Sequence, residues 1–174
     1  LMESNKLDSA MILYKSAEKL SPKNAAAVRK IGQVLSKQGK HQEAIKTLQK
    51  AVTLNPKDSY TYLALGEAML KSESPDQAEQ PLLKAKELNK QLTQACVLLG
   101  DFYQSRGKAD PARSNYKDAI RIDANLLDVR KKMVTVTLDD NERDPARDEP
   151  IAVDKDPYVD LGVLNRSVVY PQVA

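Results

Sequence analysis

Three glycines, Gly32, Gly66 and Gly100, recur at a spacing of 34 residues, and each directly follows a large apolar residue. Alanines keep the same step, first at Ala10, Ala44, Ala78 and Ala112, and again seven residues later at Ala17, Ala51, Ala85 and Ala119. Small residues at fixed helical positions let neighbouring helices approach closely. A unit of this kind repeated every 34 residues predicts a stack of helix pairs.

The repeating residues resemble those of the tetratricopeptide repeat family in three consecutive units. Residues 25–58 match it through Val28, Ile31, Gly32, Leu35, Ala44, Leu48, Ala51 and Pro56. Residues 59–92 match it through Tyr62, Leu65, Gly66, Met69, Ala78, Leu82 and Ala85. Residues 93–126 match it through Cys96, Leu99, Gly100, Tyr103, Ala112, Tyr116 and Ala119. The closing proline is replaced by Lys90 and Ala124 in the last two units. The resemblance implies an all-α chain, a right-handed α-solenoid of antiparallel helix pairs.

The repeat phase extends beyond the three full units and divides the chain into two parts. Residues 1–24 hold the second half of a repeat whose first helix is absent, so we expect an uncovered apolar face there and a longer parent protein upstream. An apolar stripe predicts a capping helix over 127–138, which closes a repeat domain of residues 1–138. Residues 139–174 form a non-helical tail, first acidic and proline-rich and then β-prone. Within the second unit, Pro81 predicts a kink or a late helix start.

The net charge of +3 hides an uneven distribution. Residues 139–160 hold nine acidic and three basic side chains, a net charge of −6, whereas residues 1–138 carry +8. A lysine-rich solvent face is the ordinary meaning of a basic helical body. A nucleic-acid surface would need interleaved aromatic or arginine side chains, which are few here, so we expect no nucleic-acid partner. The acidic tail is expected to dock on the basic repeats of its own or a neighbouring chain; the alternative is a tail that wraps the outer surface.

The first helix of each unit is expected to line a concave groove that binds a peptide or protein segment. Residues one turn apart on these helices share a face. The candidate groove residues are Arg29, Gln33, Lys37, Tyr60, Leu63, Glu67, Leu70, Gln94, Val97, Asp101 and Gln104, with Ala26 beside them.

The groove chemistry allows two interpretations. Glu67 and Asp101 would suit a ligand with a lysine or arginine, with apolar contacts from Tyr60 and Leu63; alternatively, both acids only face solvent or pair with a nearby lysine. Chaperone-binding members of the family hold a C-terminal carboxylate in a clamp of basic and asparagine side chains. Arg29 and Gln33 offer part of such a clamp, but the residues Ala64, Gln94 and Leu98 do not continue it. Recognition of a chaperone tail is therefore disfavoured.

No pattern of residues supports catalysis, a metal site or a cofactor. The single histidine, His41, lies in a predicted turn, and the single cysteine, Cys96, takes a core position. No apolar stretch is long enough to enter a membrane, and the composition fits a soluble protein of either the cytoplasm or a bacterial periplasm. We therefore expect a non-enzymatic scaffold or adaptor. The alternatives are a regulatory or targeting domain of a larger enzyme, and a module that self-associates through its half repeat or its tail.

Overall fold

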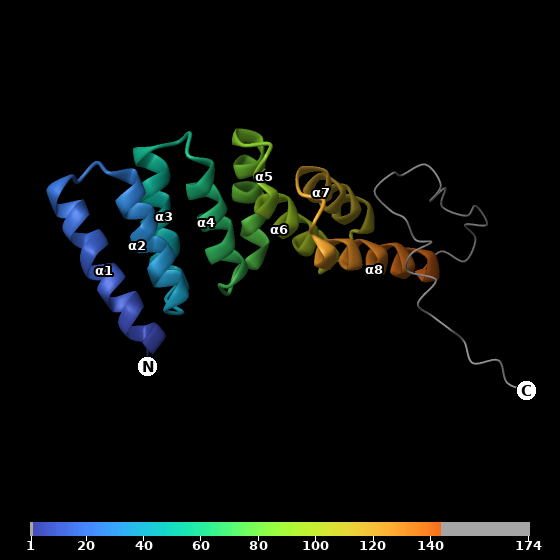
Figure 1. Ribbon diagram of the computed structural model, residues 1–174, viewed down its shortest axis with the longest axis horizontal. Helices are drawn as coiled ribbons and strands as arrows, with labels where there is room; N and C mark the ends of the chain where they lie inside the picture. The colour runs from blue at the N-terminus through green and yellow to red at the C-terminus, as the bar shows by residue number, and fades with distance from the viewer. Residues whose placement is uncertain (1, 144–174) are drawn as a thin grey trace, which may run out of the picture.

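The computed structural model describes residues 2–143, which form a row of helices in which each helix packs on the next (Figure 1). The elements are α1 (Met2–Leu20), α2 (Ala25–Lys37), α3 (His41–Leu54), α4 (Ser59–Leu70), η1 (Pro75–Ala78), α5 (Glu79–Leu88), α6 (Thr93–Gln104), α7 (Ala109–Ile122) and α8 (Leu127–Arg143). The first helices of neighbouring units also contact each other, α2 with α4 and α4 with α6. This arrangement confirms the predicted all-α solenoid.

The 34-residue spacing of the glycines arises from one contact made in every unit. The glycine of each first helix lies against the large central side chain of the second helix: Gly32 on Leu48, Gly66 on Leu82 and Gly100 on Tyr116. These three large side chains are completely buried. A glycine is needed because the partner side chain fills the place where a Cβ atom would stand. The same contact repeats down the stack, so the core is continuous from unit to unit.

Local sequence signals set the helix ends. Asn24 accepts a hydrogen bond from the Ala27 amide at 3.1 Å, and Asp58 accepts one from the Tyr60 amide at the same distance. Each therefore satisfies an amide at the start of its helix that has no intrahelical partner. Gly39 and Gly107 occupy the turns inside their units with φ of 80° and 66°, a region that disfavours side chains.

The second unit departs from its neighbours where Pro81 falls. The chain first forms the short 3-10 helix η1, and α5 begins only at Glu79, so Pro81 stands in its first turn. A proline there interrupts no helical hydrogen bond. The late helix start predicted from Pro81 is thus observed, and α5 is only 10 residues long.

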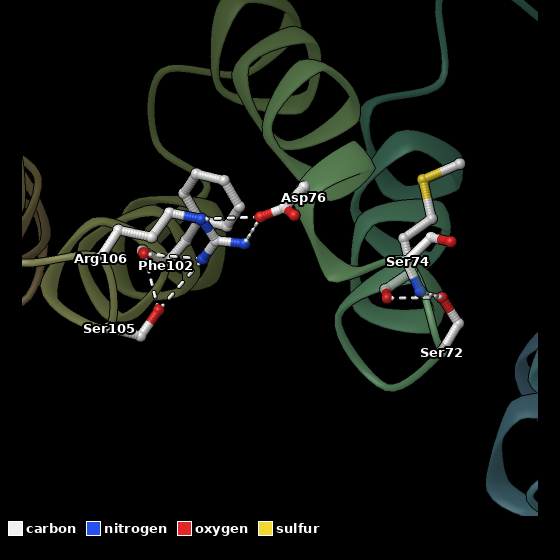
Figure 2. A network of polar contacts seen from close by, with 7 residues as sticks. Ser72, Ser74, Asp76, Phe102, Ser105 and Arg106 are labelled. Atoms are coloured by element: carbon white, nitrogen blue, oxygen red, sulfur yellow. Dashed lines mark hydrogen bonds and ion pairs between the residues drawn. The ribbon is translucent and has the colours of Figure 1, made fainter.

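A polar contact from the third unit reaches this altered segment. Figure 2 shows Arg106 reaching across to Asp76 of η1, with its Nε atom 3.0 Å from the carboxylate. The guanidinium carbon lies 3.6 Å from the centre of the Phe102 ring, and its Nη1 atom donates to the Phe102 carbonyl oxygen. Asp76 itself is largely exposed, so the ring contact and the backbone bond position the arginine more than the ion pair does.

The last helix covers the open end of the third unit, but it is longer than predicted. Its buried side chains are Val129, Met133 and Val136, and it packs on α7. We placed its end at 138, whereas α8 continues to Arg143. The first proline after it is Pro145, and the residue before a proline disfavours helical geometry, so the helix can run up to that point. The predicted β-prone runs and the rest of the tail lie outside the described residues.

The helix α1 lies at the N-terminal end of the row, and only one of its faces packs against the helices that follow. Met11 and Tyr14 of α1 are half-buried against the core, while Ile12, Leu13 and Leu20 are exposed. No described helix lies on the outer side of α1 (Figure 1). This is the uncovered apolar face expected of a half repeat.

Candidate functional site

A pocket of about 510 Å³ opens between α1, α2 and α4 and reaches the first turn of α6. Its lining residues are Leu7, Ala10 and Tyr14 from α1, Arg29, Lys30, Gln33, Val34, Ser36 and Lys37 from α2, Tyr60, Leu63, Ala64 and Glu67 from α4, Lys71 just after α4, and Gln94 from α6. Because the first helices of three units meet here, the pocket belongs to the face on which the groove was predicted.

The structure brings together some of the eleven predicted groove residues and separates the others. Seven line the pocket: Arg29, Gln33, Lys37, Tyr60, Leu63, Glu67 and Gln94. The other four do not line it: Leu70, Val97, Asp101 and Gln104. The division follows position along the row, since the residues outside the pocket belong to the last turn of α4 or to α6 beyond its first turn.

The sequence did not lead us to expect a contribution from α1, nor from the two lysines Lys30 and Lys71. Only the first helices of the units were considered, so the contribution of Leu7 and Tyr14 from α1 was not foreseen. No local pattern in α1 specifies the angle at which it packs across α2. Lys71 carried a usable signal, because it lies four residues after Glu67 and such residues share a helix face.

Arg29 is the most firmly held cation in the pocket. Its Nε atom lies 3.1 Å from the Asp58 carboxylate in an ion pair that lacks hydrogen-bond geometry, and both side chains are largely buried. The guanidinium also lies over the Tyr60 ring, 5.9 Å from its centre. Asp58 is itself held by the amide and hydroxyl groups that it caps at the start of α4. Arg29 is therefore preorganised on a rigid helix start, which lowers the ordering cost of a ligand contact.

Glu67 is the only acidic residue among the lining residues, and its side chain is half-buried. Burial raises the pKa of this carboxyl, against the opposing effects of Lys71, Lys37 and a hydrogen bond from Gln94. Four cations, Arg29, Lys30, Lys37 and Lys71, share the pocket with it. The lining therefore carries a net charge of +3 with Glu67 ionised, and more when it is protonated.

The three pocket lysines, Lys30, Lys37 and Lys71, are not held in close ion pairs, although Lys37 and Lys71 act on Glu67 from a longer distance. Over the part of the chain that the structure describes, none of them forms an ion pair within 4.0 Å. Lys30, Lys37 and Lys71 are also exposed. Positive charges gathered in a concave site create a field that attracts an anionic group.

Asp101, the second acid expected in the groove, is engaged elsewhere. It accepts hydrogen bonds from Lys132 of α8 at 2.7 and 2.8 Å and from the Tyr116 hydroxyl of α7 at 2.6 Å. The same hydroxyl lies 2.8 Å from Oε1 of Gln104. Burial and the bond to Asp101 raise the pKa of Tyr116, so its hydroxyl stays protonated. Asp101 thus joins three helices and pairs with a lysine, as the second interpretation of the groove acids proposed.

The raised pKa of Glu67 predicts a pH-dependent cost in stability. Its native carboxyl binds a proton at a higher pH than the unfolded one, so the stability it contributes is present below the ordinary value of 4.5 and is lost as pH rises through the native pKa. Glu67→Gln keeps an acceptor for Gln94 and removes the charge. We expect the variant to be more stable than the parent at neutral pH, with the difference shrinking towards about pH 4.

Urea unfolding of both proteins at several pH values measures this difference. Glu43→Gln is the matched control, because Glu43 is an exposed side chain on α3. An advantage of the Glu67 variant that grows as the pH falls would contradict the assignment.

Comparisons with known proteins connect this geometry to a repeat family. Residues 32–72 match the model described as TPR repeat, and residues 93–126 match the one described as tetratricopeptide repeat. No curated protein sequence matches the chain.

Several solved structures share the fold. A crystal structure of MamA is 27% identical, with a TM-score of 0.72, over 83% of this chain and 85% of that one. YrrB, described as a TPR protein with an unusual peptide-binding site, is 25% identical, with a TM-score of 0.66, over 84% of this chain and 76% of its own. TTC0263 of Thermus thermophilus is 22% identical, with a TM-score of 0.66, over 84% of this chain and 80% of its own. The last likeness concerns the fold alone.

No cluster of three or more histidine, cysteine or acidic side chains could hold a metal ion in residues 2–143. In the same part of the chain, every helix is too short or too polar to cross a membrane.

Proposed function

This chain is a tetratricopeptide repeat protein, and from that premise we propose that it is an interaction scaffold whose pocket binds an acidic peptide segment of a partner protein. The observation that carries the proposal is that three lysines stand beside the anchored Arg29 and form no close ion pair with any residue of 2–143. An acidic peptide would provide carboxylates for these cations. Because the three lysines are exposed, we expect the affinity for such a peptide to fall as the salt concentration rises.

The pocket also offers apolar surface to such a peptide. Tyr60 is 51% exposed although it is a large aromatic side chain, and it stands beside Leu63 on the same lining. Exposed aromatic side chains next to charges often mark binding surfaces, because one ring offers both apolar and polar contact. We therefore infer a ligand that combines acidic residues with an apolar or aromatic one.

This ligand class differs from the basic ligand considered from sequence. A basic ligand requires Glu67 and Asp101 to be available as anions. Both acids already have cationic neighbours: Lys37 and Lys71 act on Glu67, and Lys132 binds Asp101 together with the Tyr116 hydroxyl. A lysine or arginine entering the pocket would meet Lys30, Lys37 and Lys71 as well as Glu67, so like-charge repulsion opposes its binding.

The fold and one of the similar proteins support a binding role. Stacked helix pairs present a preformed concave surface, so the scaffold loses little conformational freedom when a peptide binds. YrrB, one of the similar structures, is described as having a peptide-binding site. The tetratricopeptide repeat is in general a non-catalytic interaction module, and we propose no reaction for this chain.

Selection from a random peptide library on the immobilised full chain tests the proposal. We expect the selected peptides to be rich in aspartate and glutamate. We then expect Lys37→Gln combined with Lys71→Gln to weaken their binding by about tenfold, which corresponds to about 1.4 kcal/mol.

The matched control is Lys46→Gln combined with Lys57→Gln, which removes the same charge from exposed positions outside the pocket. Equal losses in the two double variants would show only a general effect of net charge. Binding that neither double variant weakens would overturn the proposed site.

A further inference from the structure

The single acid of the pocket stands beside cations that an acidic peptide would also need. Glu67 is half-buried on α4 and is the only acidic lining residue. Lys37, the last residue of α2, and Lys71, just after α4, both favour its ionised carboxylate. The Gln94 amide of α6 donates a hydrogen bond to Oε1 of Glu67. A carboxylate of a bound peptide would therefore compete with Glu67 for the same two lysines.

Every element that forms the pocket was considered for charges that face Glu67. Among the described residues, the charged lining groups other than Glu67 are Arg29, Lys30 and Lys37 from α2 and Lys71 after α4. The helix α6 contributes only the neutral Gln94, and Asp101, two turns further along α6, is bound by Lys132. Tyr14 is the titratable group that α1 contributes, and no residue of α3, η1 or α5 belongs to the lining. The surroundings of Glu67 are therefore cationic or neutral until an acidic ligand arrives.

We propose that Glu67 takes up a proton when an acidic peptide enters the pocket, so that the affinity for the peptide rises as the pH falls. This inference rests on the proposed function, because it describes how that binding is regulated. The ionised form of Glu67 repels the peptide at neutral pH. The neutral form removes this repulsion and leaves the lysines to the peptide.

Three effects of a bound peptide act on Glu67 in the same direction. The peptide carboxylates repel its negative charge, and they pair with Lys37 and Lys71, whose charges otherwise favour the ionised form. The peptide also covers a carboxyl that is already half-buried. Burial is the largest influence on the pKa of Glu67 in the free protein, and it raises that pKa. Because all three effects disfavour the ionised form, the pKa rises further in the complex.

The neutral form of Glu67 fits the pocket as it stands. A protonated carboxyl still has an oxygen that accepts the hydrogen bond from Gln94. Without the charge of Glu67, the four lining cations give the pocket a net charge of +4 instead of +3. The regulation therefore acts through charge and requires no movement of a helix.

The pH dependence has a definite sign. The pKa of Glu67 is higher in the complex than in the free protein, so the gain in affinity is present below the pKa of the free protein. It is lost as the pH rises through the pKa of the complex. We expect the affinity to rise about fivefold as the pH falls from about 7 towards the ordinary carboxyl value of 4.5, which corresponds to about 1 kcal/mol.

Isothermal titration calorimetry on the full chain tests the inference with a probe that does not itself titrate. The probe is a synthetic peptide in which cysteic acid residues flank a tyrosine, because its sulfonates stay ionised throughout this pH range. We expect the parent to show the fivefold rise in affinity. We also expect it to take up a fraction of a proton on binding, which makes the measured enthalpy depend on the ionisation enthalpy of the buffer.

Glu67→Gln is the informative variant, since it keeps an acceptor for Gln94 and carries no charge. We expect it to bind the probe at neutral pH about as tightly as the parent does near the low end of the range, and without proton uptake. Glu43→Gln is the matched control, because it removes the same charge from an exposed position on α3 and should behave like the parent. Other titrating groups are common to these proteins and cancel in the comparison.

Each alternative result has a distinct meaning. If the parent and Glu67→Gln bind the probe with the same pH dependence, or if the parent releases protons on binding, the inference is overturned. The proposed function still stands in that case, because both proteins bind the acidic probe. If neither protein binds it at millimolar concentration, the proposed function fails and the inference fails with it.

Discussion

Replacing Gly100 with alanine is expected to destabilise the protein by about 2–3 kcal/mol, the range typical of an overpacked core. A Cβ atom at this position would stand 2.5 Å from Cδ1 and 2.9 Å from Cζ of Tyr116, well inside van der Waals contact. The change also adds an alanine to the interior of α6, where it would favour the helix by about 1 kcal/mol over glycine. We expect the steric cost to exceed that gain.

Tyr116 cannot move aside cheaply to accept the new methyl group. Its side chain is completely buried, and its hydroxyl is held by Asp101 at 2.6 Å and Gln104 at 2.8 Å. A shift of the ring would lengthen those bonds and disturb the ion pair of Asp101 with Lys132. The substitution therefore acts on the junction of α6, α7 and α8 and not only on one contact.

Urea unfolding monitored by circular dichroism measures the effect of Gly100→Ala. Gly39→Ala is the informative comparison, because no atom lies within 4 Å of its added Cβ and the only cost is its φ of 80°. That cost is about 1–2 kcal/mol. If Gly100→Ala were neutral or stabilising, the close approach of α6 and α7 would be wrong.

Leu82→Ala is expected to cost about 2–5 kcal/mol, as large-to-small substitutions in a rigid core do. Leu82 is completely buried in the central unit, where α5 lies against α4. The second helix of this unit, α5, has 10 residues, against 14 in α3 and in α7, so the central unit has less helix to hold this contact. Each unit of a repeat protein contacts only its neighbours, so a weak central unit is also expected to reduce the cooperativity of unfolding.

Gly66 provides a sharp test of the same contact. A Cβ at Gly66 would stand 2.6 Å from both Cγ and Cδ2 of Leu82, so Gly66→Ala alone should be destabilising. In the Leu82→Ala protein those atoms are absent, and the added methyl group enters the space they leave. We expect Gly66→Ala to become neutral or stabilising in that background, with a coupling free energy of about 1–3 kcal/mol.

A double-mutant cycle over the four proteins measures this coupling. Gly32→Ala in the Leu82→Ala background serves as the control, because Gly32 meets Leu48 in another unit and should couple weakly with position 82. Additive effects of Gly66→Ala and Leu82→Ala would contradict the proposed packing.

Much of the fold could be predicted because its signal is local and repeated. The positions of Gly32, Gly66 and Gly100 predicted which helix faces meet, since only a residue without a side chain fits under Leu48, Leu82 and Tyr116. The helix start at Asn24 and the late start near Pro81 followed from backbone chemistry within a few residues. The end of α8 was placed too early, because the acidic composition after position 138 was interpreted as a linker.

The candidate site could be predicted only in part. The one-turn spacing placed Arg29 and Gln33 on one face of α2, and the 34-residue period placed Glu67 at the position on α4 that Gln33 has on α2. It could not predict that α1 closes one side of the pocket, since the packing angle of a half repeat has no local signal.

The sequence by itself determined a repeating stack of helix pairs, because the small residues that permit close packing recur at a fixed step. Only the tertiary structure decided the electrostatic character of the pocket. Asp101 is engaged by Lys132, 31 residues away, and Glu67 lies in a partly buried setting near Lys37. The charge that a ligand meets depends on such long-range pairs and on burial, and neither is contained in the spacing of residues along one helix.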